Sequence, residues 1–241
     1  MKIAVVNMVG NIGKSTIAAH LLMPRMKDKP RFFSIETINS GAEKDGISVE
    51  KMKGKQFGEL TDEMMRCSSA IVDVGSTNLD DFLKQLQQFH GSHEDFDCFL
   101  VPAVSGKVGK DRKAMEDTVK TILQLQSLGV DRKRVKVVFN QVDTDDDIFN
   151  LFSPLFGLAE LQKNCTVSEK AAIYSNEVFD RIKSLGLPLA AVLADKTDYK
   201  AQLRTAKTEE EKDRAIDMIT LRRLATSANK NLDDVYAALF K

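Results

Sequence analysis

Residues 8–16 read Met-Val-Gly-Asn-Ile-Gly-Lys-Ser-Thr, and this stretch decides the expected fold. It follows an apolar run at residues 2–7 and precedes an apolar, helix-like run at residues 17–22. A strand, a turn that ends in Gly-Lys-Ser and a helix together form the layout of a phosphate-binding loop, or P-loop. Backbone N–H groups of such a loop surround phosphate oxygens, and the helix N-terminus adds partial positive charge. The residues expected to hold the nucleotide are Val9, Gly10, Asn11, Ile12, Gly13, Lys14, Ser15 and Thr16.

Within this loop, Lys14 and Ser15 would carry the chemistry. The Lys14 ammonium group is expected to act in catalysis at the β- and γ-phosphates, and the Ser15 hydroxyl is expected to bind Mg²⁺. The pattern G-x-x-x-x-G-K-[ST] has glycine at its first position, where this chain has Met8. A chance Gly-Lys-Ser at a helix start is the alternative, but the apolar runs on both sides favour nucleotide binding.

A second polar group follows another apolar run. Residues 69–75 read Ser-Ala-Ile-Val-Asp-Val-Gly. A carboxylate where a strand ends can hold Mg²⁺ through its water shell, so Asp73 is predicted to bind metal and to act in catalysis. Gly75 would let the backbone approach the γ-phosphate. Ligands bind at the carboxyl ends of parallel strands, which places both residues near the loop. The alternative is an ordinary strand-to-turn sequence.

The composition of the chain excludes several classes of protein. Its 35 basic and 35 acidic residues balance, so no global field favours DNA, RNA or anionic lipid. Cys67, Cys98 and Cys165 are widely separated, which indicates neither a zinc site nor a disulfide framework. No stretch approaches the roughly 20 apolar residues of a membrane span, and the first apolar run is too short for a signal peptide. We expect a cytoplasmic protein without a membrane anchor, whose contact with DNA, if any, is indirect.

The order of patterns predicts an α/β fold with a doubly wound, mostly parallel sheet and the P-loop after the first strand. Short β-branched or aromatic runs alternate with helical patterns, which is typical of such sheets. Apolar residues at helical spacing predict helices over 79–89 and 111–128. Strands are expected at residues 2–7, 31–36, 69–73, 97–102, 135–140, 171–174 and 188–193.

The last part of the chain differs from the rest and is expected to be a helical tail. Residues 208–211 read Thr-Glu-Glu-Glu, a capping-box pattern that predicts a helix through about residue 225. The charged start is most simply a solvated helix face, although Lys212, Arg222 and Arg223 could contact a partner or DNA. Residues 232–240 form a further segment with an apolar side.

We therefore divide the chain into two parts. Residues 1–195 are expected to form the nucleotide-binding α/β domain, and residues 196–241 are expected to form helices packed on it. The total of 241 residues suits one large α/β domain.

The loop also resembles that of the deviant Walker proteins, the ParA/MinD-like family of partition and division-site P-loop ATPases. Gly10 and Gly13-Lys14-Ser15 lie where that family has K-G-G-x-G-K-[ST]. The resemblance covers most of the chain but is specific only at short motifs. Within the family, the chain is most similar to the plasmid stability proteins called StbB, followed by the conjugal-transfer TraL-type proteins. It implies an Mg²⁺-dependent ATPase that forms a homodimer on nucleotide and serves plasmid stability, positioning or conjugal transfer with a partner protein.

The resemblance also assigns roles to residues outside the loop. It identifies Asp73 and Gly75 as the Walker B and switch II positions. The family has an aspartate at the end of the second strand, where it orients the attacking water. Glu36 is the nearest acidic residue here and is predicted to be catalytic, with an exposed glutamate at a strand end as the alternative.

Residues 140–143, Asn-Gln-Val-Asp, would select the base. The family has an asparagine here that bonds the adenine edge, and Asn140 matches it. The stretch is also similar to the N-K-x-D motif of GTPases, whose aspartate accepts two hydrogen bonds from guanine; Gln141 replaces the lysine of that motif. Asp143 can also be a solvated turn residue. We expect Asn140 and Asp143 at the base, with ATP as the cofactor and GTP as the alternative.

The most consequential departure from the family is Val9, which occupies the position of the signature lysine that reaches the partner's phosphates. Lys107 and Lys110 are candidate substitutes, although a solvent-exposed basic loop is the simpler interpretation. Asn11 also replaces a glycine. We expect a weak ATPase that works as an ATP switch. The alternatives are a hydrolysis-dead adaptor and a small-molecule P-loop kinase.

Overall fold

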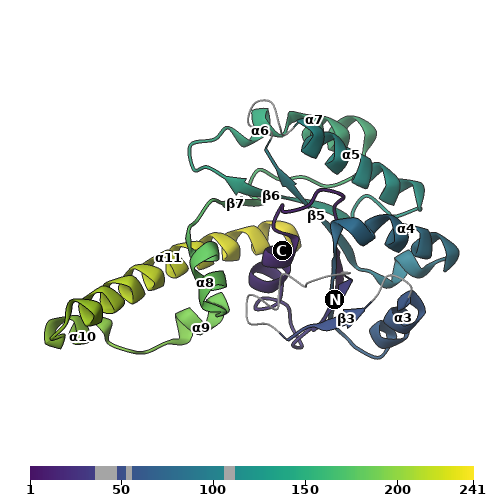
Figure 1. Cartoon of the computed structure of the whole chain (residues 1–241). Helices are drawn as coiled ribbons and strands as arrows, with labels where there is room; N and C mark the ends of the chain where they lie inside the picture. Colours follow the sequence, from purple (N-terminus) through teal and green to yellow (C-terminus); the bar gives the residue numbers. More distant parts are fainter. Residues whose placement is uncertain (36–47, 53–55, 106–111) are drawn as a thin grey trace.

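A computed structural model describes residues 1–35, 48–52, 56–105 and 112–241, and its strands form one sheet (Figure 1). The strands are β1 (Lys2–Val5), β2 (Arg31–Ile35), β3 (Glu50–Met52), β4 (Ala70–Val74), β5 (Cys98–Val104), β6 (Val135–Val142) and β7 (Ala172–Tyr174). Their order is β3-β2-β4-β1-β5-β6-β7, and every pairing among them is parallel. The expected α/β fold is confirmed, with β1 at the centre of the sheet.

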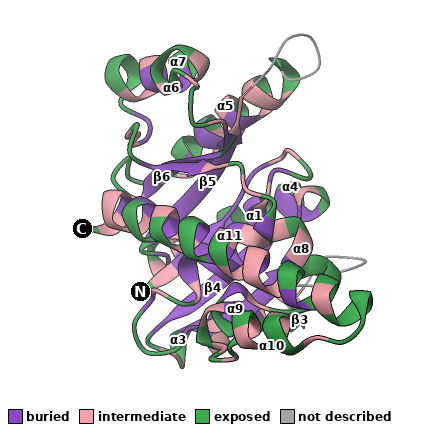
Figure 2. Cartoon of the chain, turned by 90° about the vertical axis from the view of Figure 1, so that its left-hand side faces the viewer, coloured by how far each residue is buried: buried purple, intermediate pink, exposed green. Residues whose placement is uncertain are grey.

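Helices cover both faces of this sheet, so its inner strands are buried on both sides, whereas the edge strand β3 is largely exposed (Figure 2). One face carries α3 (Phe57–Met65), α4 (Leu79–Gln88), α5 (Arg112–Ser127), α6 (Ile148–Leu151), α7 (Ser153–Gly157) and the π-helix η5 (Leu158–Gln162). The other face carries α1 (Lys14–Thr16), the π-helix η1 (Ile17–Leu22), α8 (Val178–Leu185), α9 (Leu189–Ala194) and α11 (Glu209–Phe240). Two short 3₁₀ turns, η3 (Ser76–Asn78) and η4 (Ser92–Asp95), complete the first face.

The sequence of β6 shows why the strands have apolar runs without alternation. Val137 packs into the core of the first face, whereas Val138, one residue later, packs into the core of the second. Successive side chains of a strand point to opposite faces, so a strand covered on both faces needs both to be apolar. The helices α4 and α5 confirm the two amphipathic helices expected before and after β5.

The C-terminal helix α11 begins with the expected capping box but is much longer than expected. Thr208 Oγ1 accepts a hydrogen bond from the Glu211 N–H at 3.2 Å, and the Glu211 carboxylate accepts one from the Thr208 N–H at 3.2 Å. The predicted end near residue 225 is wrong, because one helix of 32 residues continues to Phe240. Neither glycine nor proline interrupts this stretch.

A stripe of buried side chains runs along α11 at helical spacing. It consists of Ala215, Leu221, Ala225, Ala228, Leu232, Val235 and Leu239. In Figure 1 the first turns of α11 project beyond the sheet, beside α10 (Tyr199–Thr205), while its later turns lie against the core.

Two strand predictions need correction. The expected strand at residues 188–193 is helix α9, because Leu189 and Val192 are buried on one side while the alanines between them favour a helix. The edge strand β3 was not predicted, since Glu-Lys-Met offers no apolar run. Among the described helices, none is both long enough and apolar enough to cross a membrane.

Candidate nucleotide-binding site

The predicted loop leaves the central strand β1 and is anchored by a buried asparagine at its start. Asn7 Oδ1 accepts a hydrogen bond from the Val9 N–H at 2.9 Å. The Asn7 amide donates to the Pro102 carbonyl on β5 at 2.7 Å and to Thr118 Oγ1 on α5 at 2.9 Å. Asn7 therefore fixes the direction in which the loop leaves the sheet. Sequence reasoning missed this residue, although an asparagine that ends an apolar run is a visible signal.

The end of the loop is held against β6. Gly13 has φ +83°, a left-handed conformation that favours glycine, and it caps α1. Asn140 at the end of β6 donates from Nδ2 to the Ile12 carbonyl at 2.8 Å, and both the bond and the side chain are buried. A Cβ atom at Gly13 would lie 2.4 Å from Asn140 Nδ2. Two separate requirements thus select glycine at this position.

The lysine and serine of the motif both make contacts within the chain. Lys14 Nζ donates to the Val9 carbonyl at 2.7 Å, so the lysine curls back over its own loop. Ser15 Oγ donates to Asp73 Oδ2 at 2.6 Å. Asp73 is only 1% exposed, at the end of β4 next to β1. The folded chain therefore brings together the two residues that the sequence predicts to hold Mg²⁺.

A third oxygen lies beside this pair on β2. Ser34 is paired in register with Asp73, and both side chains face the same side of the sheet as α1, since Phe32 and Ile71 two residues earlier pack there. Ser34 Oγ is buried and has no hydrogen-bond partner among the described residues. Mg²⁺ prefers oxygen ligands, keeps several waters and uses few carboxylates when phosphates also bind it. The residues present thus fit this ion.

The part of the chain that the structure describes offers no larger acidic or histidine cluster as another place for a metal. Among the described residues, no group of three or more His, Cys, Asp or Glu side chains could hold a metal ion. A site of two hydroxyls and one carboxylate suits an ion that is bound together with phosphate rather than a permanent structural metal.

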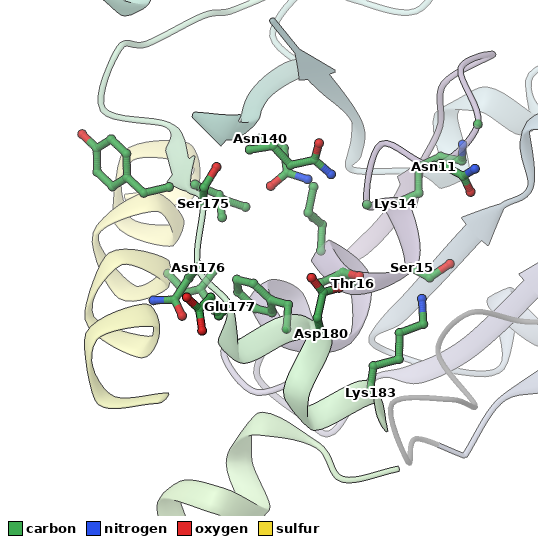
Figure 3. A pocket seen from close by; sticks show the side chains of 18 of the residues that line it. Asn11, Lys14, Ser15, Thr16, Asn140, Ser175, Asn176, Glu177, Asp180 and Lys183 are labelled. Atoms are coloured by element: carbon green, nitrogen blue, oxygen red, sulfur yellow. The ribbon is translucent and has the colours of Figure 1, made fainter. Parts of the chain in front are cut away.

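A cavity of about 840 Å³ opens in front of the loop (Figure 3). Its volume lies within the range of small-molecule sites. The loop and the end of β6 supply one part of its lining, namely Gly10, Asn11, Gly13, Lys14, Ser15, Thr16, Asn140 and Gln141. The opposite wall comes from β7, from the turn after it and from α8, while Leu232 of α11 also contributes.

This opposite wall is polar, and sequence reasoning missed it entirely. Its polar side chains in Figure 3 are Ser175, Asn176, Glu177, Asp180 and Lys183. Asn176 accepts a hydrogen bond from the N–H of residue 178 at 2.9 Å, which fixes the start of α8. These residues face the loop only because β7 lies beside β6 in the sheet. No motif marks them in the sequence.

Of the remaining predicted residues, Gly75, Asp143, Val9 and Ile12 are described, and they are not among those that line the cavity. The Gly75 N–H donates a hydrogen bond at 2.9 Å to the carbonyl of Ile35, the last residue of β2. Asp143 begins a turn in which its N–H donates to Asp146 Oδ2 at 3.0 Å. Val9 and Ile12 contribute the backbone carbonyls that receive Lys14 and Asn140. Glu36, Lys107 and Lys110 lie outside the described residues.

The helix that follows the loop is tied to α11 by Arg25. The Arg25 guanidinium donates to the His20 carbonyl of the π-helix η1 at 2.7 Å. It also donates to Asn229 Oδ1 and to Asp233 Oδ1, both at 2.7 Å and both on α11. Only 9% of the Arg25 side chain is exposed. The helix that follows the loop and the C-terminal helix α11 are therefore joined by partly buried, charge-assisted hydrogen bonds.

Comparison with known proteins gives structural likeness without sequence likeness. No family profile matches the chain, and no curated protein sequence matches it either. Among solved structures, the chain is similar to Cyanothece McdA in two forms. An aspartate-to-alanine variant in complex with ATP is 11% identical with a TM-score of 0.45, over 96% of each chain. The apo protein is 12% identical with a TM-score of 0.47, over 90% of this chain and 98% of McdA.

Proposed function

We propose that this protein binds a nucleoside triphosphate together with Mg²⁺ and works as a nucleotide-dependent switch of the partition-ATPase type. The observation that carries the proposal is the 2.6 Å contact between Ser15 and Asp73, beside Lys14 and at the floor of a cavity of nucleotide size. A glycine turn, a lysine, a hydroxyl and a carboxylate at the carboxyl ends of parallel strands suit Mg²⁺-dependent phosphate binding.

Each residue has a defined part in this proposal. Lys14 would exchange the Val9 carbonyl for phosphate oxygens, which gives the ammonium group a charged partner in place of a neutral one. Ser15 would contact the metal directly, and Asp73 would hold it through water. When bound, Mg²⁺ would neutralise charge on the phosphates. Backbone N–H groups of the loop would surround the phosphate nearest to α1.

We propose ATP rather than GTP as the nucleotide. Guanine recognition of the kind seen in GTPases requires the aspartate of the N-x-x-D stretch to reach the base. Here Asp143 belongs to a turn with Asp146 and does not line the cavity, whereas Asn140 does. The Asn140 amide bonds the Ile12 carbonyl through Nδ2, which leaves its Oδ1 as an acceptor for the amino group of adenine.

We further propose that intrinsic hydrolysis is slow and that a partner or a second copy of the chain controls the switch. Val9 supplies no cation, so charge on the transferring phosphoryl group would be less well stabilised than in relatives with a lysine there. A role in plasmid stability or conjugal transfer, acting through a partner protein, is the biological setting that the loop motif suggests. All three cysteines are free, which supports a cytoplasmic site of action.

Titration of the full chain with Mg-ATP and Mg-GTP by calorimetry tests the central claim. We expect saturable binding of Mg-ATP, weaker binding of Mg-GTP and a large loss of affinity in EDTA. Size analysis with a non-hydrolysable ATP analogue tests dimerisation in the same sample. A chain that binds neither nucleotide would rule out the proposal, whereas fast turnover without any partner would rule out only the slow switch.

A further inference from the structure

The charges around the cavity are unevenly placed. Among the described residues that line it, the cations are Lys14 and Lys183, and the anions are Glu177 and Asp180. A triphosphate with one Mg²⁺ retains about two negative charges, which a single lysine does not balance. Lys14 is the one cation that residues 8–16 supply, so a second cation for the phosphates has to come from another part of the chain. Lys183 is the described lining residue that can supply it.

The position of Lys183 places its charge at the phosphate end of the cavity. Figure 3 shows its side chain extending from α8 toward Ser15, whereas Ser175 lies toward the Asn140 end of the same wall. The backbone that carries it is fixed, because Val178 and Ile182 on the buried side of α8 are fully enclosed in the core of the second face. The lysine thus extends toward the loop side of the cavity from a helix whose position is fixed by the core.

The ammonium group of Lys183 is also free to bind a ligand. No described residue forms an ion pair or a hydrogen bond with it. Asp180 lies one turn earlier on α8 but does not pair with it, and Glu177 pairs instead with Arg181 at 3.0 Å.

We propose that Lys183 binds the terminal phosphate of the nucleotide from within the same chain. It would supply the cation that Val9 does not supply, from α8 rather than from the loop. This inference rests on the proposed function, since it assigns a further residue to the same site. It predicts that the affinity difference between triphosphate and diphosphate depends on Lys183.

The test compares Lys183→Gln with Lys196→Gln, an exposed lysine that does not line the cavity. Mg-ATP, Mg-ADP and AMP are titrated by calorimetry into the full chain. We expect Lys183→Gln to weaken Mg-ATP binding by about 10-fold, the value of one charge-assisted hydrogen bond. Mg-ADP binding should weaken less, AMP binding should not change, and Lys183→Arg should restore most of the affinity for Mg-ATP. Lys196→Gln should bind all three nucleotides as the wild type does.

The outcomes separate this inference from the function on which it rests. If the wild type binds Mg-ATP and Lys183→Gln binds it equally well, Lys183 does not contact the phosphates and the inference is wrong. An equal loss for all three nucleotides also contradicts it, because a terminal-phosphate contact must discriminate among them. If the wild type binds no nucleotide, the proposed function itself fails. Thermal unfolding of each variant checks that the exposed substitutions leave the fold intact.

Discussion

The amide nitrogen of Asn140 lies where a side chain on Gly13 would have to be. A Cβ at Gly13 would approach Asn140 Nδ2 to 2.4 Å, and that nitrogen already donates to the neighbouring Ile12 carbonyl. The end of the P-loop and the end of β6 therefore form one packed unit. Contact of this kind makes the loop conformation depend on a residue more than a hundred positions away in the sequence.

Gly13→Ala should both destabilise the chain and abolish nucleotide binding. Alanine at φ +83° costs about 1–2 kcal/mol in backbone strain, and the clash with Asn140 adds to it. Gly91→Ala is the matched control, because Gly91 has φ +85° with no atom within 4 Å of the added Cβ. Urea unfolding should show a larger loss for Gly13→Ala than for Gly91→Ala. Equal losses would mean that Asn140 moves aside without cost.

Asp73→Asn should weaken Mg-ATP binding while it leaves the fold intact. Asparagine keeps an oxygen for the Ser15 hydroxyl but loses the charge that acts on the metal. Affinity is measured with Mg²⁺ and with EDTA, and Asp145→Asn, in the exposed turn after β6, serves as the control. The wild type should show a large difference between the two conditions, and Asp73→Asn a small one. If the wild type binds ATP equally well with Mg²⁺ and with EDTA, Asp73 does not act through a metal ion.

Lys14→Ala should abolish nucleotide binding, because phosphate charge loses its nearest cation. In the folded chain the Lys14 ammonium group reaches the Val9 carbonyl, which is a backbone acceptor in the same loop. We therefore expect circular dichroism and the unfolding midpoint to stay close to those of the wild type. Unchanged affinity for Mg-ATP would show that the loop is not a phosphate site.

Asp143→Asn should leave the choice of base unchanged. Asp143 lies in a turn outside the cavity lining, so its carboxylate is not placed to accept from guanine. Competition between ATP and GTP is measured for wild type and variant. If Asp143 did read guanine, the loss of its acceptor would lower the GTP preference by several kcal/mol, because the donors of the base would be left unpaired. A strong GTP preference in the wild type would also overturn the choice of ATP.

Val9→Lys should raise turnover or nucleotide-dependent dimerisation. A cation delivered to the transferring phosphoryl group is worth about 10³–10⁵ in rate where other systems supply one. The main chain of Val9 stays in place, since its carbonyl and N–H contact Lys14 and Asn7 irrespective of the side chain. Phosphate release and size analysis are the measurements. If the wild type already hydrolyses ATP quickly and Val9→Lys does not raise that rate, another cation already acts on the phosphates.

The sequence predicts the parts of the site that lie in short local motifs. Residues 9–16 and Asp73 carry recognisable chemistry at the ends of apolar runs, and the fold brings Ser15 and Asp73 into contact as expected. The opposite wall could not be predicted, because Ser175 and Lys183 reach the loop only through the order of strands in the sheet. Strand order depends on long-range packing, which one sequence does not reveal.

The errors in the fold prediction have the same origin. Residues 188–193 are apolar enough for a buried strand, and periodicity alone does not separate a short strand from a short buried helix. Packing against α11 stabilises this segment as the helix α9 rather than as a strand. In the C-terminal part, the capping box at Thr208 could be predicted because it depends only on residues three positions apart. The true length of α11 depends on the core that it covers.

The junction at Arg25 has a consequence for how the protein is made. The layer around the P-loop helix is synthesised early, but Asn229 and Asp233, which hold Arg25, leave the ribosome about two hundred residues later. Until then the apolar face that α11 covers is exposed, as is usual for chains that are still growing. The ability to bind nucleotide should therefore appear only when synthesis nears the last turns of α11. Shorter nascent chains would not bind nucleotide, because they cannot yet fold.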